Sequence, residues 1–433
     1  MGNLRPFQVI VMGIFGLIAL IGLVVFANFQ GFSSNAPQVG TVTIWGTLPA
    51  KPVNDALTAY KQGRAELGRV SYVERPEETF DADVAEAIAS GNGPDLLLIS
   101  QEDLPAAESK LTYFPSSIIS EREFRDSFLP INELYLREGG TYGMPLVVDP
   151  LVLFYNRPVI AAAGVARPPT TWEAVSGLTA SVNQQTGAQT VTRSLIALGT
   201  YENIENARAI LSLLFLQAGY KVSERGEAGY RSDLMDVRTG MLGASPAESA
   251  LNFYTEFANP TKTVYSWNRS LPNNRQGFLA GDVALYLGFA SERAGLAEAN
   301  PNLDFDMTTA PNPGTATTRM TYGKAYAFAI PRASKNPQGA VAVSELLTAK
   351  EPSLLFARTL GMAPAARAAL APKDGDLYEP VYFPEALIAR GWLSPAPAET
   401  DRVFATMVGN VMSGRESLVT AIQTAARSLT AAY

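Results

Sequence analysis

Two residue types that the chain lacks restrict its possible chemistry. None of the 433 residues is a histidine or a cysteine. Without histidine there is no Ser-His-Asp triad, imidazole base or His-ligated zinc; without cysteine there is no thiolate nucleophile, disulfide or lipid-modified N-terminal cysteine. Paired carboxylates, a Ser-Lys pair and oxygen-ligated hard cations remain possible.

Three carboxylate pairs could offer oxygen ligands to calcium, namely Asp81/Asp83, Asp304/Asp306 and Asp374/Asp376. The last pair flanks Gly375 but lacks the remaining ligand spacing of a calcium-binding loop. Such short acidic pairs are typical of solvated turns. The sequence therefore predicts no metal and no other cofactor.

Asp149 is an acidic residue within an otherwise apolar stretch. It follows Leu146–Val148 and precedes Leu151–Phe154, which together have the pattern of a buried strand. A carboxylate in such a place is costly unless it is hydrogen-bonded or faces a cleft. Asp149 is therefore a candidate ligand-binding residue, and a structural hydrogen bond is the alternative.

Three tryptophans form a second group of candidates. Sugars are recognised by flat aromatic faces that pack on their C–H surfaces and by planar polar groups that fix their hydroxyls. Trp45 ends a predicted strand, Trp267 lies in a polar stretch, and Trp392 lies in a predicted loop between helices. Each is a candidate for ligand contact, with packing in a core as the alternative.

The overall composition is that of a globular protein with more than one core. Hydrophobic residues make up 47% and charged residues 17% of the chain, and its length is typical of two or three domains. The 34 basic and 41 acidic residues give a net charge of −7. Because no run of Lys and Arg forms a basic stripe, we expect no nucleic-acid partner.

The N-terminal segment predicts export. Val9–Ala27 contains no charged side chain and is long enough to span a bilayer. Arg5 precedes it, so the positive-inside rule places the N-terminus in the cytoplasm and the following chain outside. We expect residues 1–30 to be an uncleaved transmembrane anchor, with a cleaved signal segment as the alternative. Residues 31–40 are predicted to be a stalk.

The exported part alternates short apolar runs with helical periods, which predicts α/β layers. Strands are expected at Thr41–Trp45, Val70–Val73 and Asp95–Ile99, with helices between them. This order is that of a parallel, doubly wound sheet, whose ligands bind beyond the carboxyl ends of the strands. Trp45 and Ser100–Glu102 lie at that edge.

Four blocks resemble the extracellular solute-binding family of ABC transporters that includes the maltose-binding protein. Gly140–Val175 contains the motifs L-x-Y-N and P-x-T-W-E and, together with the preceding Gly139, G-x-x-Y-G-x-P. Three further blocks follow the family's pattern at Val84–Leu96, Phe278–Leu285 and Gly323–Leu347. The resemblance covers roughly residues 41–430. It implies a periplasmic-binding-protein-like fold whose two lobes close on a small solute.

The resemblance also implies how the chain divides and which residues meet the ligand. Residues 41–148 and 315–385 would form the first lobe, and residues 149–314 and 386–433 the second, joined by several crossovers. Asp149 would match an acidic crossover residue that contacts ligand, and Phe289 an aromatic that stacks on sugar; Tyr322 lies near a crossover. The ligand would be a sugar or oligosaccharide, delivered to an ABC permease without turnover.

Three alternatives remain open on the sequence alone: an anchored glycosidase, a binder of another solute, and an adhesion or scaffold role in which the cleft has degenerated. An anchored glycosidase would need only two carboxylates about 5–10 Å apart, a spacing that a sequence does not reveal. A binder of another solute, such as a polyamine or a peptide, would share the fold. Binding without turnover would separate the first alternative from the main prediction, and a ligand screen would separate the others.

Overall fold

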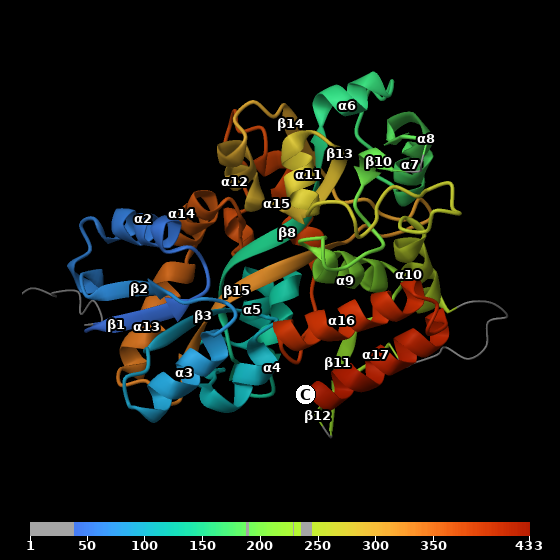
Figure 1. Cartoon of the computed structure of the whole chain (residues 1–433). Coiled ribbons are helices and arrows are strands. Elements are labelled where there is room, and N and C mark those ends of the chain that lie inside the picture. The colour runs from blue at the N-terminus through green and yellow to red at the C-terminus, as the bar shows by residue number, and fades with distance from the viewer. Residues whose placement is uncertain (1–38, 188–189, 228, 235–244) are drawn as a thin grey trace, which may run out of the picture.

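The computed structural model describes residues 39–187, 190–227, 229–234 and 245–433 (Figure 1). The predicted anchor at Val9–Ala27 lies outside these residues, as does most of the predicted stalk. Within the described residues, no helix is long and apolar enough to cross a membrane.

A parallel sheet forms the first half of the molecule. Its central strand β1 (Val42–Gly46) lies between β2 (Val70–Glu74) and β3 (Leu96–Ser100), parallel to both. Helix α2 (Ala50–Lys61) connects β1 to β2, and α3 (Phe80–Ala89) connects β2 to β3. The predicted β-α-β-α-β order is thereby confirmed.

Two long strands connect this sheet to the rest of the molecule (Figure 1). Strand β15 (Thr321–Pro331) pairs antiparallel with β3 and with the first part of β8 (Met144–Asn156). The second part of β8 pairs antiparallel with β13 (Val283–Phe289) and β14 (Phe305–Thr308). Partners change at Pro150, which has no N–H to donate. All strands on this path therefore belong to one mixed sheet.

The second half of the molecule is built on β13 and β10 (Val191–Ile196), which pair in parallel; β10 also pairs with β9 (Gln184–Gln185). Four helices pack against one another there, namely α9 (Ala207–Gln217), α10 (Pro246–Glu256), α16 (Pro397–Met412) and α17 (Leu418–Ala432). The C-terminal helices thus return to the second half, although the exact limits of the two lobes stay a prediction.

The remaining elements are shorter or peripheral. The helices are α4 (Leu104–Ala107), α5 (Glu121–Ser127), α6 (Arg157–Ala162), α7 (Trp172–Gly177), α8 (Thr179–Val182), α11 (Asn274–Ala280), α12 (Glu292–Ala299), α13 (Pro337–Thr348), α14 (Lys350–Leu360) and α15 (Glu379–Ile388), with 3-10 turns η1 (Ala65–Leu67), η2 (Glu108–Lys110), η3 (Pro130–Tyr135) and η4 (Arg367–Ala369). The strands are β4 (Leu111–Thr112), β5 (Phe114–Pro115), β6 (Leu136–Arg137), β7 (Gly140–Thr141), β11 (Ser223–Gly226), β12 (Gly229–Ser232), β16 (Ala363–Pro364) and β17 (Ala389–Arg390).

Helix starts follow the local sequence closely. Ser245 and Glu248 have the spacing of a capping box, and the box is present: the Ser245 side chain accepts from the Glu248 N–H, while the Glu248 carboxylate accepts from the Ser245 N–H. Thr170 and Glu173 have the same spacing, but the N-cap of α7 is Thr171, whose side chain accepts from the Ala174 N–H. The Thr170 carbonyl instead accepts from the Asn312 N–H, which ties it to a neighbouring segment.

Candidate functional site

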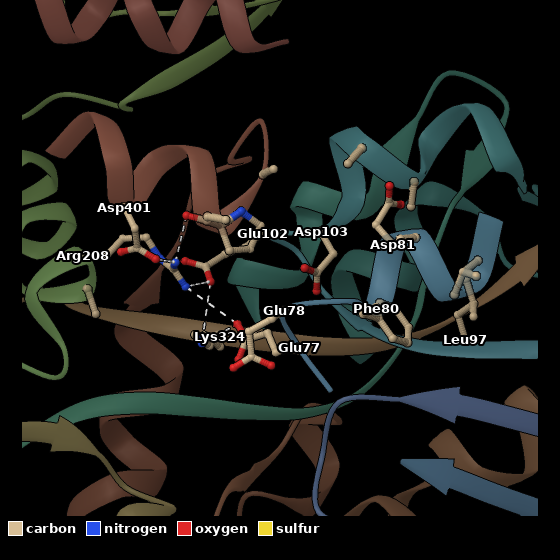
Figure 2. A pocket seen from close by; sticks show the side chains of 18 of the residues that line it. Glu77, Glu78, Phe80, Asp81, Leu97, Glu102, Asp103, Arg208, Lys324 and Asp401 are labelled. Atoms are coloured by element: carbon tan, nitrogen blue, oxygen red, sulfur yellow. Dashed lines mark hydrogen bonds and ion pairs between the residues drawn. The ribbon is translucent and has the colours of Figure 1, made fainter. Parts of the chain in front are cut away.

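A cavity of about 640 Å³ lies between α3 and α4 on one side and α9 and α16 on the other. We call it the charged cavity, because seven acidic and three basic residues line it: Glu77, Glu78, Asp81, Glu102, Asp103, Glu205, Asp401, Lys110, Arg208 and Lys324. Figure 2 shows Arg208 between Glu102 and Asp401, with Lys324 and Glu77 beneath them. The two halves of the molecule meet across this cavity.

Glu102 is the most deeply buried of the charged lining residues. It follows the carboxyl end of β3, and its side chain is 1% exposed. The Tyr322 hydroxyl donates to one carboxylate oxygen, and Arg208 Nη2 donates to the other at 3.1 Å. Burial would raise the pKa of Glu102, but Arg208 and Lys324 outweigh it and hold the pKa below its ordinary value. Glu102 is therefore a carboxylate at neutral pH.

Arg208 joins the two sides of the charged cavity. It lies in the first turn of α9, and its Nη1 donates to Asp401 at 2.5 Å and to the Pro397 carbonyl at 3.1 Å, both in α16. Burial would lower its pKa, but Glu102 and Asp401 raise the pKa above the ordinary value. The guanidinium therefore stays charged and holds one carboxylate from each half.

Lys324 brings a second cation into the cavity from β15. Its ammonium lies 3.7 Å from Glu102 and 4.0 Å from Glu77. The same ammonium sits 5.3 Å from the centre of the Phe289 ring, which is within cation–π range. Phe289 ends β13 and lines the cavity, so this predicted residue lies among the charged groups.

Asp103 has no cationic partner among the described residues. Its Oδ2 accepts from the Ser100 hydroxyl at 2.7 Å and from the Ser100 N–H at 3.1 Å. Burial raises the pKa of Asp103 to about 6, although the Ser100 hydrogen bonds oppose this shift. The cavity therefore contains a carboxyl group that changes charge slightly below neutral pH.

Asp149 is buried beside the charged cavity and is not one of its lining residues. Only 3% of it is exposed, and it accepts from the Ser291 hydroxyl at 2.6 Å and the Ser291 N–H at 3.2 Å. Burial raises the pKa of Asp149 to about 7. The structure thus shows the structural hydrogen bond that the sequence left as an alternative, and ligand contact by Asp149 stays a prediction.

Two of the predicted tryptophans are buried in the second half. Trp267 is 1% exposed, and the Gly277 Cα lies so close that an added Cβ would come within 3.7 Å of the indole. Trp392 donates from Nε1 to the Ser212 hydroxyl at 2.9 Å and packs near Phe404. Neither indole lines the charged cavity, although Trp392 lines a separate cavity of about 570 Å³. Ligand contact by either stays a prediction.

Trp45 lies in the first half, and Tyr322 lies beside that half near the start of β15. Trp45 is buried at the end of β1, with the Arg75 guanidinium 3.8 Å from its ring centre. Tyr322 is fully buried on β15, and its hydroxyl donates to Glu102. Neither residue lines the cavity, although Tyr322 contacts one that does. Their predicted ligand contacts stay predictions as well.

Arg208, Lys324 and Asp401 were not among the candidates from the sequence. Arg208 interrupts the apolar helix that begins near Ile204, and Lys324 interrupts the apolar strand Tyr322–Ile330. A charge within a buried element is the pattern that identified Asp149, so the same rule would have selected both. Asp401 lies on an amphipathic helix, and no local pattern distinguishes it from other surface acids.

The site offers no evident place for a metal. Within the residues that the structure describes, no group of acidic side chains is arranged to hold a metal ion. Three carboxylates of the charged cavity, Glu102, Asp103 and Asp401, are already bonded to arginine, lysine, tyrosine or serine. What the site can do is hold a polar solute between two parts of the chain.

A cavity between two α/β halves that are connected through long shared strands defines a class of solute-binding proteins. The sequence agrees, because the family of bacterial extracellular solute-binding proteins matches residues 56–379. The chain belongs to this family. No protein with a curated function matches it.

Solved structures share the fold over nearly their whole length. The cyclic α-maltosyl-1,6-maltose binding protein of Arthrobacter globiformis is 16% identical with a TM-score of 0.72, covering 91% of this chain and 98% of its own. The maltotriose-binding protein of Thermus thermophilus is 16% identical with a TM-score of 0.65, covering 90% and 100%. At such identities the likeness establishes the periplasmic-binding-protein-like fold.

Proposed function

We propose that the protein captures a sugar or oligosaccharide in the charged cavity and delivers it to an ABC permease. The observation that carries this proposal is the cavity itself: it lies between two halves and is lined from both by planar polar groups. Solved relatives of the same fold are named for maltotriose and cyclic maltosyl-maltose binding, which supports a carbohydrate ligand. No catalytic turnover is expected.

The side chains of the cavity suit a hydroxyl-rich ligand. The Glu102 and Asp401 carboxylates can accept from hydroxyls, and the fork of Arg208 can donate to them. Phe289 and Phe80 supply the aromatic surface on which the C–H face of a sugar ring packs. These groups come from both halves, so a ligand would contact both at once.

Capture would proceed by closure of two lobes. We assign residues 41–148 and 315–385 to the first lobe and 149–314 and 386–433 to the second, as the family's pattern implies. Strands β8 and β15 would carry the hinge, and the Asp149–Ser291 hydrogen bonds lie beside it. Closure would shrink the radius of gyration on binding, which solution scattering measures.

The excess of acid in the cavity favours a second candidate, a cationic solute such as a polyamine. Each cavity cation already has a carboxylate within 4.0 Å, whereas Glu78, Asp103 and Glu205 have no cationic partner among the described residues. An ammonium group would be attracted to this surplus. Binding of a polyamine would weaken steeply with salt, whereas binding of a neutral sugar would not.

A thermal-shift screen of residues 39–433 tests these proposals. Maltotriose, mannobiose, glucose, spermidine and amino acids would each be added well above the expected dissociation constant. A ligand at 100 times that constant adds about 2.7 kcal/mol of stability. A sugar that stabilises the protein and is recovered unchanged supports the main proposal; hydrolysis of the sugar, or no response to any sugar, contradicts it.

We also assign the N-terminal segment the role of a membrane anchor. The 19 uncharged residues Val9–Ala27 and the lack of a lipid-modifiable cysteine support this assignment. A mature protein that fractionates with membranes and keeps its N-terminus agrees with it. A mature N-terminus at Asn28 would show cleavage instead.

A further inference from the structure

A second set of side chains joins the two halves away from the charged cavity. Glu108 in η2 and Arg137 in β6 belong to the first half, while Arg225 and Tyr230 belong to the β11–β12 hairpin that α17 covers. We call these residues the hairpin clasp: Glu108, Arg137, Arg225 and Tyr230.

Each of the four side chains of the clasp contacts another member. The Tyr230 hydroxyl donates to Glu108 at 2.5 Å and accepts from Arg137 Nη2 at 2.5 Å. Arg137 also donates to both Glu108 oxygens at 3.3 Å, and Arg225 lies 3.2 Å from Glu108. The side chains of Arg137 and Glu108 are only 10% and 15% exposed. Such shielded, shared hydrogen bonds are stronger than surface ion pairs.

The clasp is firmly attached to the second half. The Tyr230 ring stacks on Tyr433, with centroids 5.2 Å apart and an interplanar angle of 27°. The Tyr433 hydroxyl donates to the Leu393 carbonyl, and Thr430 of α17 accepts from the Ser232 N–H at 3.0 Å. These contacts connect the hairpin to α17 and to the segment before α16.

In the first half, the clasp includes Glu108 of the α4–η2 segment, and this segment lines the charged cavity. Asp103, Ala106, Ala107 and Lys110 of the α4–η2 segment line that cavity, whereas Glu108 does not. Glu108 instead meets the hairpin of the other half. The α4–η2 segment therefore lines the charged cavity with some of its side chains and contacts the second half through Glu108.

We propose that the hairpin clasp fixes the α4–η2 wall against the second half and sets the balance between open and closed lobes. Glu108 and Tyr230 are its positioning residues, and neither lines the charged cavity. This inference rests on the lobe closure of the proposed function. Loss of a hydrogen bond to a charged group shifts an equilibrium about 10-fold, so loss of the Tyr230 hydroxyl raises the open-to-closed ratio by that factor.

The test uses the absence of cysteine from the chain. Glu86 on α3 and Thr406 on α16 are exposed and lie in different halves. Both are changed to cysteine and spin-labelled, and the distance between the labels is measured by double electron–electron resonance without ligand. Tyr230→Phe and Glu108→Gln are compared with the labelled parent. Tyr155→Phe is the matched control, because its hydroxyl contacts Asp306 within one half.

We expect Tyr230→Phe and Glu108→Gln to move the distances toward longer values, while Tyr155→Phe leaves them unchanged. Tyr230→Phe keeps the ring and its stacking on Tyr433, so circular dichroism should show an intact fold. Distances that match the parent in both clasp variants would overturn the inference. Maltotriose and spermidine are then added: if neither shortens the distances of the parent, the proposed ligand class fails, whereas the clasp result stands on the unliganded samples.

Discussion

Replacing Arg208 by alanine tests whether the charged cavity is held by one interaction between its two sides. The variant leaves Glu102, with 1% of its side chain exposed, beside Lys324 at 3.7 Å and without its hydrogen-bonded cation. Removing one partner of a buried ion pair typically costs about 3–5 kcal/mol, because an uncompensated charge remains. Asp401 is 45% exposed and can be rehydrated, so it adds little to this loss.

The pH dependence identifies Glu102 as the source of that loss. In the parent, Arg208 and Lys324 hold the Glu102 pKa below its ordinary value, so its contribution to stability is present above the unfolded pKa and is lost as pH falls. In Arg208→Ala, the guanidinium that opposes the effect of burial on Glu102 is missing, so the pKa of Glu102 should rise. The variant then loses stability as pH increases, and the gap between variant and parent widens from pH 4.5 to pH 7.5.

Urea unfolding at both pH values measures these differences, with Glu102→Gln and the double variant completing a cycle. Glu102→Gln should restore part of the stability of Arg208→Ala, because it removes the stranded charge. The matched control is Arg402→Ala, whose partner Glu399 lies on the surface of the same helix α16. A loss below about 1 kcal/mol for Arg208→Ala, or no recovery in the double variant, would refute the assigned role of this pair.

Further predictions concern the residues proposed from the sequence. Burial raises the pKa of Asp149 to about 7, so between about pH 4 and pH 7 the folded chain holds a proton that the unfolded chain releases, and the free energy of unfolding falls as pH rises. Asp149→Asn should remove this part of the fall. Parallel curves of unfolding free energy against pH for variant and parent would contradict the prediction. Phe289→Ala should weaken binding of the ligand found by the screen about 5- to 150-fold through lost contact, as isothermal titration measures. Trp267→Ala should lower the free energy of unfolding by about 3–5 kcal/mol, because the indole is 1% exposed; a loss of affinity as well would agree with the predicted ligand contact, and an unchanged affinity would contradict it.

Much of the fold was predictable because it follows from local rules. The apolar runs at Val70–Val73 and Asp95–Ile99 became β2 and β3 within one residue at each end. Ser245 formed its capping box as its sequence requires. The division of β8 between two sets of partners was less evident, because its burial is continuous and only Pro150 marks the change.

The site was harder to predict, because the face on which a side chain points depends on packing far along the chain. Trp267 and Trp392 are flanked by polar or turn residues in the sequence, yet both are 1% exposed, and Trp392 contacts Ser212 and Phe404, which lie on helices α9 and α16. Phe289 reached the cavity because it ends a strand at the edge where ligands of such sheets bind. A charge inside an apolar element was an incomplete guide: Asp149 was chosen by that rule and does not line the cavity, whereas Arg208 and Lys324 fit the same rule and do.

The pairing within the charged cavity has a consequence for specificity. A ligand hydroxyl that bonds to Glu102 or Asp401 exchanges one hydrogen bond for another, so each contact adds little net affinity. Affinity must then come from many simultaneous contacts with the ligand and from closure of the lobes around side chains that are already held in place. An anionic ligand would compete with Glu102 and Asp401 for Arg208 and would meet the unpaired Asp103, Glu78 and Glu205. We therefore expect the cavity to disfavour anionic ligands through repulsion by these carboxylates.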